Sequence, residues 1–140
     1  MSSKHQEITD LQNLIQKLNS VKNGIVVVEG KRDEYALKSI GFSGKIFQFH
    51  SFKGLGKFVD KIPTSGKLIL LLDSDRKGRY LTKRIISLLQ HRVDIDLTFR
   101  RKITLITKGK IRNIEDLSHY VDDDDWTTNK HLYLPIENLD

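Results

Sequence analysis

The chain has no cysteine among its 140 residues, so it contains neither a disulfide nor a thiolate-bound metal. No apolar run reaches the roughly 18–20 residues that a membrane-spanning helix needs. The N-terminus, MSSKHQEITD, lacks the apolar core of a signal peptide. We therefore expect a cytoplasmic protein, and the length suits a single domain.

Acidic residues are scarce in the middle of the chain, although the net charge of +6 is modest. Residues 76–112 hold twelve Lys or Arg and two acids, whereas residues 113–140 hold one Lys and eight acids. A basic segment beside an acidic tail indicates a polyanionic partner. We expect nucleic acid rather than a membrane, because the segment is not one amphipathic helix rich in Trp or Phe. A well-solvated surface would carry the same charges.

Hydrophobic periodicity predicts alternating strands and helices. Helices are expected at residues 5–20, 32–40, 56–61 and 77–91, and strands at residues 25–28, 45–49, 68–72 and 93–99. Residues 100–112 fit either element, and Asn113 is expected to cap a further helix. This alternation predicts an α/β, Rossmann-like, mainly parallel sheet of about four strands with helices on both faces. We divide the single domain into residues 1–23 (N-terminal helix), 24–98 (core) and 99–140 (basic segment, C-terminal helix and acidic tail).

Three acids follow the two most apolar predicted strands. Glu29 ends the run Ile25–Val28, and Asp73 and Asp75 follow Leu68–Leu72. If the two strands are neighbours, these carboxylates converge at the carboxyl edge of the sheet, where α/β proteins bind ligands. Mutually repelling carboxylates favour a bound cation, and hard oxygen ligands favour Mg²⁺, or Mn²⁺, over Zn²⁺.

Each of these acids also has a purely structural explanation. Asp73 and Asp75 could be helix caps or turn residues, and Glu29 could pair with Lys31 or Arg32. The combination of all three acids favours the metal site. His50 is the one histidine expected near it.

Cations and glycines surround the acids in sequence. Gly78, near a helix start, allows close approach of a backbone, and helix N-termini attract phosphate. Basic residues are therefore predicted to bind nucleic acid or phosphate together with Gly78: Lys31, Lys53, Arg76, Lys77, Arg79, Lys83, Arg84, Arg100, Arg101 and Lys102. The loop around Lys53, with Gly54 and Gly56, lacks the Walker spacing, and a plain turn explains it better.

Two motifs resemble those of the Toprim domain, which type IA and type II topoisomerases, bacterial-type primases, OLD-type nucleases, recombination proteins and small ribonucleases share. The first is Val-Val-Val-Glu29-Gly30-Lys31-Arg32-Asp33, and the second is Leu-Leu-Leu-Asp73-Ser74-Asp75-Arg76-Lys77-Gly78. The resemblance covers about residues 24–98. It implies the Toprim fold, with Glu29 as general acid/base or metal ligand and with Asp73 and Asp75 as Mg²⁺ ligands.

The form Val-Glu-Gly-Lys-x-Asp is most similar to the small ribonuclease that matures 5S ribosomal RNA. Residues 111–117 are similar to a segment of short archaeal Toprim proteins. The chain departs from the topoisomerases, because it has no DNA-gate domain and no evident tyrosine module, which argues against strand passage. It also has Lys77 where a third Asp would stand, and this puts a two-metal site in doubt.

These features lead to three hypotheses of function. The first is a Mg²⁺-dependent nuclease, with RNA slightly favoured over DNA. The second is a non-catalytic module that binds nucleic acid or an RNA-processing complex. The third, ranked low, is an aspartate-based phosphatase or receiver with Asp73 as phosphoacceptor, although the acidic pair expected after the first strand of a receiver is missing.

Overall fold

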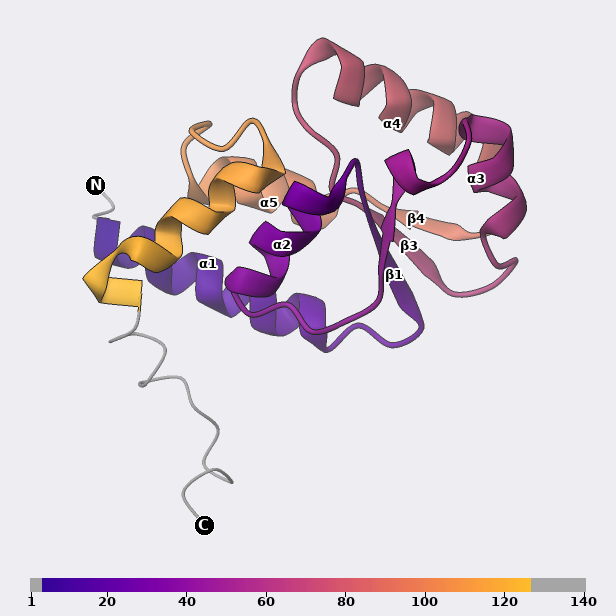
Figure 1. Ribbon diagram of the computed structural model, residues 1–140. Coiled ribbons are helices and arrows are strands. Elements are labelled where there is room, and N and C mark those ends of the chain that lie inside the picture. The colour runs from indigo at the N-terminus through magenta and orange to yellow at the C-terminus, as the bar shows by residue number, and fades with distance from the viewer. Residues whose placement is uncertain (1–3, 127–140) are drawn as a thin grey trace.

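The computed structural model describes residues 4–126, which form an α/β fold around a four-stranded sheet (Figure 1). Its strands are β1 (Gly24–Val28), β2 (Ile46–Gln48), β3 (Lys67–Leu70) and β4 (Asp94–Asp96). They lie in the order β2-β1-β3-β4, and every pair is parallel. The predicted Rossmann-like fold class is therefore confirmed.

Helices cover both faces of this sheet. They are α1 (Lys4–Asn19), α2 (Lys31–Ser39), α3 (Leu55–Lys61), α4 (Arg76–Leu89) and α5 (Thr98–Ile106), with the 3₁₀ helices η1 (Phe49–Ser51) and η2 (Ile114–Asp122). Within residues 4–126, no helix combines the length and the apolar character of a membrane span. The acidic run 122–125 of the predicted tail follows η2 within the described residues, whereas the tail beyond Trp126 lies outside them.

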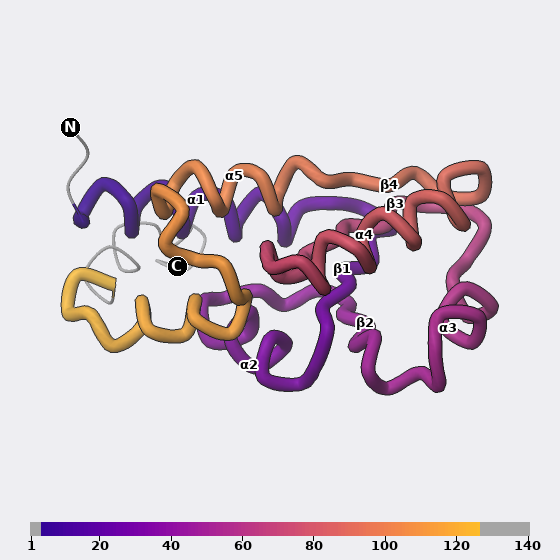
Figure 2. Tube along the Cα trace, turned by 90° about the horizontal axis from the view of Figure 1, so that it is seen from above, coloured from indigo at the N-terminus to yellow at the C-terminus, as the bar shows by residue number. Residues whose placement is uncertain are grey.

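Alternating side chains of β1 divide the core into two layers, because successive residues of a strand point to opposite faces. Val26 and Val28 pack with α1, α2, α5 and η2, whereas Ile25 and Val27 pack with α3 and α4. Figure 2 shows α1 and α5 running side by side within the first layer, where they are in contact. The sheet is thus buried on both faces, which explains why its strands read as continuous apolar runs.

The helix boundaries agree closely with the sequence pattern. Helix α2 ends as predicted at Gly41, whose φ of 109° is accessible to glycine at little cost. The Gly41 and Phe42 amides donate to the carbonyls of Lys38 and Leu37 at 3.1 and 3.0 Å. This double bond pattern is the Schellman motif that closes many helices.

The predicted fourth strand is wrong in its length. It was expected over residues 93–99, but β4 ends at Asp96, whose carboxylate accepts the Thr98 amide at 2.7 Å and the Thr98 hydroxyl at 2.6 Å. These local hydrogen bonds turn the chain and start α5. Phe99 is therefore a buried helix residue, and the ambiguous segment that follows is helical as far as Ile106.

The predicted cap of the last helix is also wrong. Asn113 precedes η2 but its side chain makes no capping hydrogen bond, and η2 is a 3₁₀ helix. The Ile114 amide instead donates to Asp73 Oδ1 at 2.9 Å. A carboxylate distant in sequence therefore caps this segment, and sequence reading searches only neighbouring positions.

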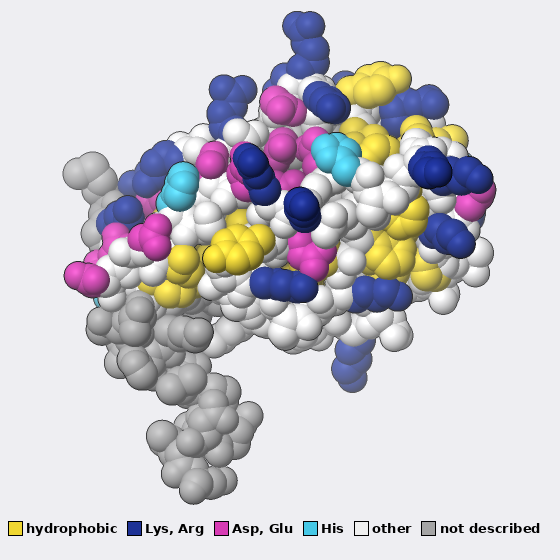
Figure 3. Space-filling model, viewed as in Figure 1, with side chains coloured by type: hydrophobic (Ala, Val, Ile, Leu, Met, Phe, Trp, Pro, Cys, Tyr) yellow, Lys and Arg dark blue, Asp and Glu magenta, His cyan; other side chains and the backbone are white. Residues whose placement is uncertain are grey.

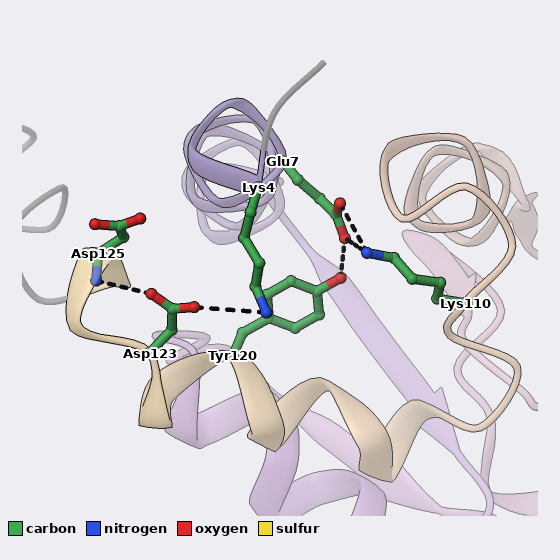
Figure 4. Close-up of polar contacts among 6 residues, drawn as sticks. All are labelled: Lys4, Glu7, Lys110, Tyr120, Asp123 and Asp125. Atoms are coloured by element: carbon green, nitrogen blue, oxygen red, sulfur yellow. Dashed lines mark hydrogen bonds and ion pairs between the residues drawn. The ribbon is translucent and has the colours of Figure 1, made fainter. Parts of the chain in front are cut away.

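A buried polar cluster fastens η2 to α1 (Figure 4). Glu7 is 4% exposed and accepts hydrogen bonds from the Tyr120 hydroxyl and from Lys110 Nζ, the latter at 2.9–3.0 Å. Burial pushes the pKa of Glu7 upward, but these two donors outweigh it and hold the pKa below its ordinary value. Beside this cluster Lys4 pairs with Asp123 at 3.5 Å and lies over the Tyr120 ring.

The cluster predicts the effect of removing one hydroxyl. Tyr120→Phe keeps the ring but leaves the buried Glu7 carboxylate with one donor fewer, so it should lower the free energy of unfolding by about 1–3 kcal/mol in urea denaturation. Tyr35→Phe is the matched control, because Tyr35 is 70% exposed. Equal stability of the two variants would contradict the structural role of the Glu7 contact.

Candidate metal and phosphate site

The acids lie at the point where the strand order changes direction. From β1 the chain continues to β2 on one side, whereas β3 and β4 lie on the other side. Ligands of open α/β sheets bind beyond the carboxyl ends of the strands at such a point. Val27 of β1 pairs with Leu70 of β3, so Glu29 and Asp73 leave adjacent strands at the same edge. The condition that the two strands be neighbours is met.

Glu29 and Asp73 are in direct contact. The Glu29 side chain is 7% exposed, and its Oε2 accepts the backbone amide of Asp73 at 2.9 Å. The negative charge of Asp73 lies close enough to act on this carboxyl group. Burial, together with the negative charge of Asp73, raises the pKa of Glu29 from 4.5 to about 7. Glu29 thus holds its proton up to near-neutral pH, in the place that a cation would neutralise.

The loop that carries Asp73 is held by the segment before η2. Asp73 Oδ1 accepts the Ile114 amide, and the Ser74 amide donates to the Arg112 carbonyl at 2.8 Å. The Arg100 guanidinium bonds to the Leu72 carbonyl at 2.7 Å and to the Ser74 hydroxyl. The position of Asp73 therefore depends on residues almost forty positions later in the chain.

Asp75 has a different role from its two partners. Its Oδ1 accepts the Gly78 amide at 2.7 Å and caps α4, which is the structural alternative for this residue. Its negative charge nevertheless contributes to the raised pKa of Glu29. The structure thus brings Glu29 and Asp73 together, with Asp75 beside them as a helix cap.

Gly78 is explained by the chain's own backbone. A Cβ built at this position would lie 2.0 Å from the Asp73 carbonyl oxygen, so only glycine fits beneath the loop. The close backbone approach predicted for Gly78 is present, but the approaching backbone is that of Asp73. Because its amide is bonded to Asp75, the role of Gly78 is structural, and its surroundings do not support direct phosphate binding.

A further acid, Asp33, belongs to this region and was not assigned to the site from sequence. It is 7% exposed and accepts the Gly30 amide at 3.0 Å. Burial, with the nearby charges of Asp73 and Glu115, raises the pKa of Asp33. Its place in the first motif was visible, but the packing of its helix, α2, against η2 was not. Figure 3 shows acidic side chains gathered where β1 passes into α2, with Lys and Arg around them.

The predicted cations fall into two groups. Most are exposed side chains: Lys31, Lys53, Arg76, Lys77, Arg79, Lys83, Arg84, Arg101 and Lys102. Arg100 is different, because it is part-buried and also donates to the carbonyls of Ile111 and Arg112 at 3.1 Å. We correct its assignment from nucleic-acid contact to internal brace. His50 is exposed, and its Nδ1 lies 3.3 Å from a Cβ built at Gly30, next to Glu29.

These acids cannot enclose a metal ion completely, but they suit Mg²⁺, which needs few protein ligands. Within the described part of the chain, no three acidic or histidine side chains converge into a complete metal site. Mg²⁺ is commonly held by one or two carboxylates, with waters and substrate phosphates completing its octahedron. The neighbouring acids Glu29 and Asp73 fit that pattern, because ionisation of Glu29 places a second negative charge beside that of Asp73.

Comparison with known proteins identifies the family. A UPF0292 protein of Thermococcus sibiricus is 35% identical over 108 residues, which cover 76% of this chain and 84% of that protein. The chain belongs to the UPF0292 family. The UPF0292 proteins of Methanosarcina barkeri and Methanocaldococcus jannaschii are 32% and 35% identical and cover 79% and 69% of the chain. No model of a protein family matches.

A solved structure shares the fold of this UPF0292 chain. It is described as a putative protein from Aquifex aeolicus, with a TM-score of 0.63 and 28% sequence identity. The match covers 76% of this chain and 96% of the other. The α/β arrangement around the site is therefore found in a second protein.

The contact at Gly78 predicts that a Gly→Ala substitution there has the opposite effect on stability from the usual one. Alanine normally stabilises an exposed helix position relative to glycine by roughly 0.5–1 kcal/mol. Gly78→Ala should instead destabilise the protein by about 1–3 kcal/mol, because the methyl group collides with the Asp73 backbone. Gly56→Ala in α3 is the control, since a Cβ there meets nothing within 4 Å. Thermal unfolding of both variants measures the difference, and a Gly78→Ala protein as stable as Gly56→Ala would contradict the contact.

The raised pKa of Glu29 predicts how metal-free stability depends on pH. The folded protein binds this proton more tightly than the unfolded chain, so wild-type stability should fall as pH rises from about 4.5 to about 7. Glu29→Gln removes this loss and should be more stable than wild type by about 1–3 kcal/mol above pH 7, with little difference near pH 4.5.

Urea denaturation in EDTA at several pH values measures this difference. Glu34→Gln is a control of opposite sign, because hydrogen bonds from Lys38 and Gln48 lower the pKa of Glu34. That variant should lose stability relative to wild type as pH rises toward about 4.5, and the difference should stay constant at higher pH. A Glu29→Gln difference that is constant across the range would show that Glu29 ionises normally.

Proposed function

We propose that this UPF0292 protein is a Mg²⁺-dependent nuclease that cleaves phosphodiester bonds, with RNA favoured over DNA and with Mn²⁺ able to substitute. The observation that carries the proposal is the buried Glu29 carboxyl group, which is hydrogen-bonded to the backbone amide of Asp73 and lies within reach of the Asp73 charge at the switch point of the sheet. A desolvated acid pair is costly to ionise without a cation. The proposal includes membership of the Toprim family, whose two motifs contribute these residues.

The chain's own residues supply the remaining parts of the reaction. Glu29, with a pKa of about 7, can accept or donate a proton at its carboxyl oxygen near neutral pH. Glu29 and Asp73 would hold the cation, with the charge of Asp75 beside them. Mg²⁺, when bound, supplies charge neutralisation at the phosphate and activation of water.

Helix α4 provides a cationic surface next to these acids. Arg76, Lys77, Arg79, Lys83 and Arg84 are exposed on its first three turns, and no acid occurs between Arg76 and Val93. Arg79 and Lys83 line the same depression as Asp73. Phosphates bound along α4 would therefore pass close to the acid pair, and such contacts are salt-dependent and independent of sequence.

A non-catalytic nucleic-acid-binding module is the second candidate. The capping role of Asp75 favours it, since one acid of the Asp-x-Asp motif is hydrogen-bonded to the start of α4 instead of to the acid pair. In that case the cations would bind nucleic acid, and the acids would serve only the fold. The two candidates differ in their response to metal.

Metal titration tests the proposal directly. Mg²⁺ should raise the melting temperature of wild type by mass action, and the rise should be much smaller in Asp73→Asn. In the same buffers, wild type should cleave structured RNA and single-stranded DNA. Glu29→Gln should still bind these substrates but cleave them about 10²–10⁴-fold more slowly, because it lacks the proton-transfer group.

Asp60→Asn is the matched control, because Asp60 is an exposed acid of α3. It should keep both the metal response and the activity. If neither Mg²⁺ nor Mn²⁺ changes melting or activity, and Asp73→Asn behaves as wild type, the nuclease proposal fails and the binding module replaces it.

A further inference from the structure

A pocket of about 430 Å³ opens beside Asp73, between α4 and α5. Its floor is apolar and consists of Leu70, Leu72, Ile86 and Leu97. Four cations line it from the two helices: Arg79, Lys83, Arg100 and Arg101. Arg100 is the part-buried brace of the Asp73 loop, whereas the other three are exposed. Asp73 and Ser74 are part of its lining as well, so the pocket and the acid pair share one residue.

The pocket exists because β4 is short. Strand β4 pairs with β3 only from Lys67 to Ile69, and the chain then turns into α5. Beyond Ile69, the β4 side of β3 has no neighbouring strand, so the side chains of Leu70 and Leu72 are left facing the space between α4 and α5. Leu97 and Arg101 reach this space from the turn and helix that replace the predicted strand.

The residues that line the pocket indicate which kind of ligand it would bind. Apolar lining residues suit the face of a ring, and exposed cations suit phosphates. Across the described residues, no acid forms an ion pair with Arg79, Lys83 or Arg101, so their charges remain available to an anion. A ligand with both an aromatic ring and phosphates would match the apolar lining and the cations. An unpaired nucleotide of a nucleic acid is such a ligand.

We infer that this pocket binds one unpaired nucleobase of a single-stranded nucleic acid, with its flanking phosphates on Arg79, Lys83 and Arg101. The inference deepens the proposed function, on which it rests for the position of the scissile bond next to Asp73. It names the substrate class as single strands or unpaired loops. A base within a duplex is excluded, because its faces are covered by stacked neighbours.

The test measures binding without metal. Fluorescence anisotropy of the full chain in EDTA compares a labelled single-stranded RNA, a single-stranded DNA and a blunt RNA duplex of equal length. Both single strands should bind about tenfold or more tightly than the duplex, which is the scale of one base stacked in a pocket. Equal affinity for single strands and duplex would overturn the inference.

A matched pair of variants locates the preference. Thr82→Trp fills the pocket and should abolish the preference for single strands, whereas Ser87→Trp adds the same group to an exposed position of α4 and should keep it. Melting curves verify that both variants fold. A Thr82→Trp protein that folds and keeps the full preference would overturn the inference.

A second pair of variants is independent of the engineered tryptophan. Arg101→Ala should lower the ratio of single-strand to duplex affinity, whereas Arg84→Ala, outside the pocket, should weaken both affinities alike. Equal ratios in the two variants would count against the pocket. Cleavage assays with Mg²⁺ separate the two proposals: single-strand preference without cleavage refutes only the nuclease, and cleavage without such preference refutes only the nucleobase pocket.

Discussion

The candidate site depends on the hydrogen bonds that the Arg100 guanidinium donates. The guanidinium donates to the carbonyl of Leu72, the hydroxyl of Ser74 and the carbonyls of Ile111 and Arg112. One rigid planar group therefore joins the end of β3 to the segment that leads into η2. Burial lowers the pKa of this guanidinium, and the nearby charge of Asp73 acts against that shift. Without the guanidinium, the carbonyls of Leu72, Ile111 and Arg112 would lose this hydrogen-bond donor.

Rigid attachment matters because the acids do not stabilise one another. Glu29 and Asp73 carry like charges in a desolvated position, and repulsion would separate them if the loop could move. Backbone amides of Asp73 and Ile114 hold the two carboxyl groups from opposite sides. The unfavourable free energy of this arrangement is offset by apolar packing elsewhere, chiefly in the layer of α1, α2, α5 and η2. Such an arrangement is typical of sites prepared for a ligand.

Sequence reading succeeded where local pattern determines structure. The apolar runs of β1 and β3, the periodicity of the helices and the turn at Gly41 all identified their elements, and the parallel order then brought Glu29 beside Asp73. It failed where distant residues decide. The Asp96 hydrogen bonds end β4 early, the Arg100 side chain donates to carbonyls of two segments, and α2 packs against η2. Charge alone could not separate Arg100 from its exposed neighbour Arg101.

The hydrogen bond from the Ile114 amide to Asp73 also sets an order of assembly during synthesis. Both acids of the pair leave the ribosome well before residue 114, so the nascent chain already has its β1 and β3 acids but lacks the donor that orients one of them. Completion of the site must therefore wait until η2 has emerged and docked against α2. For the nuclease proposed above, this order would leave Asp73 without the Ile114 donor until the segment after Arg112 has left the ribosome.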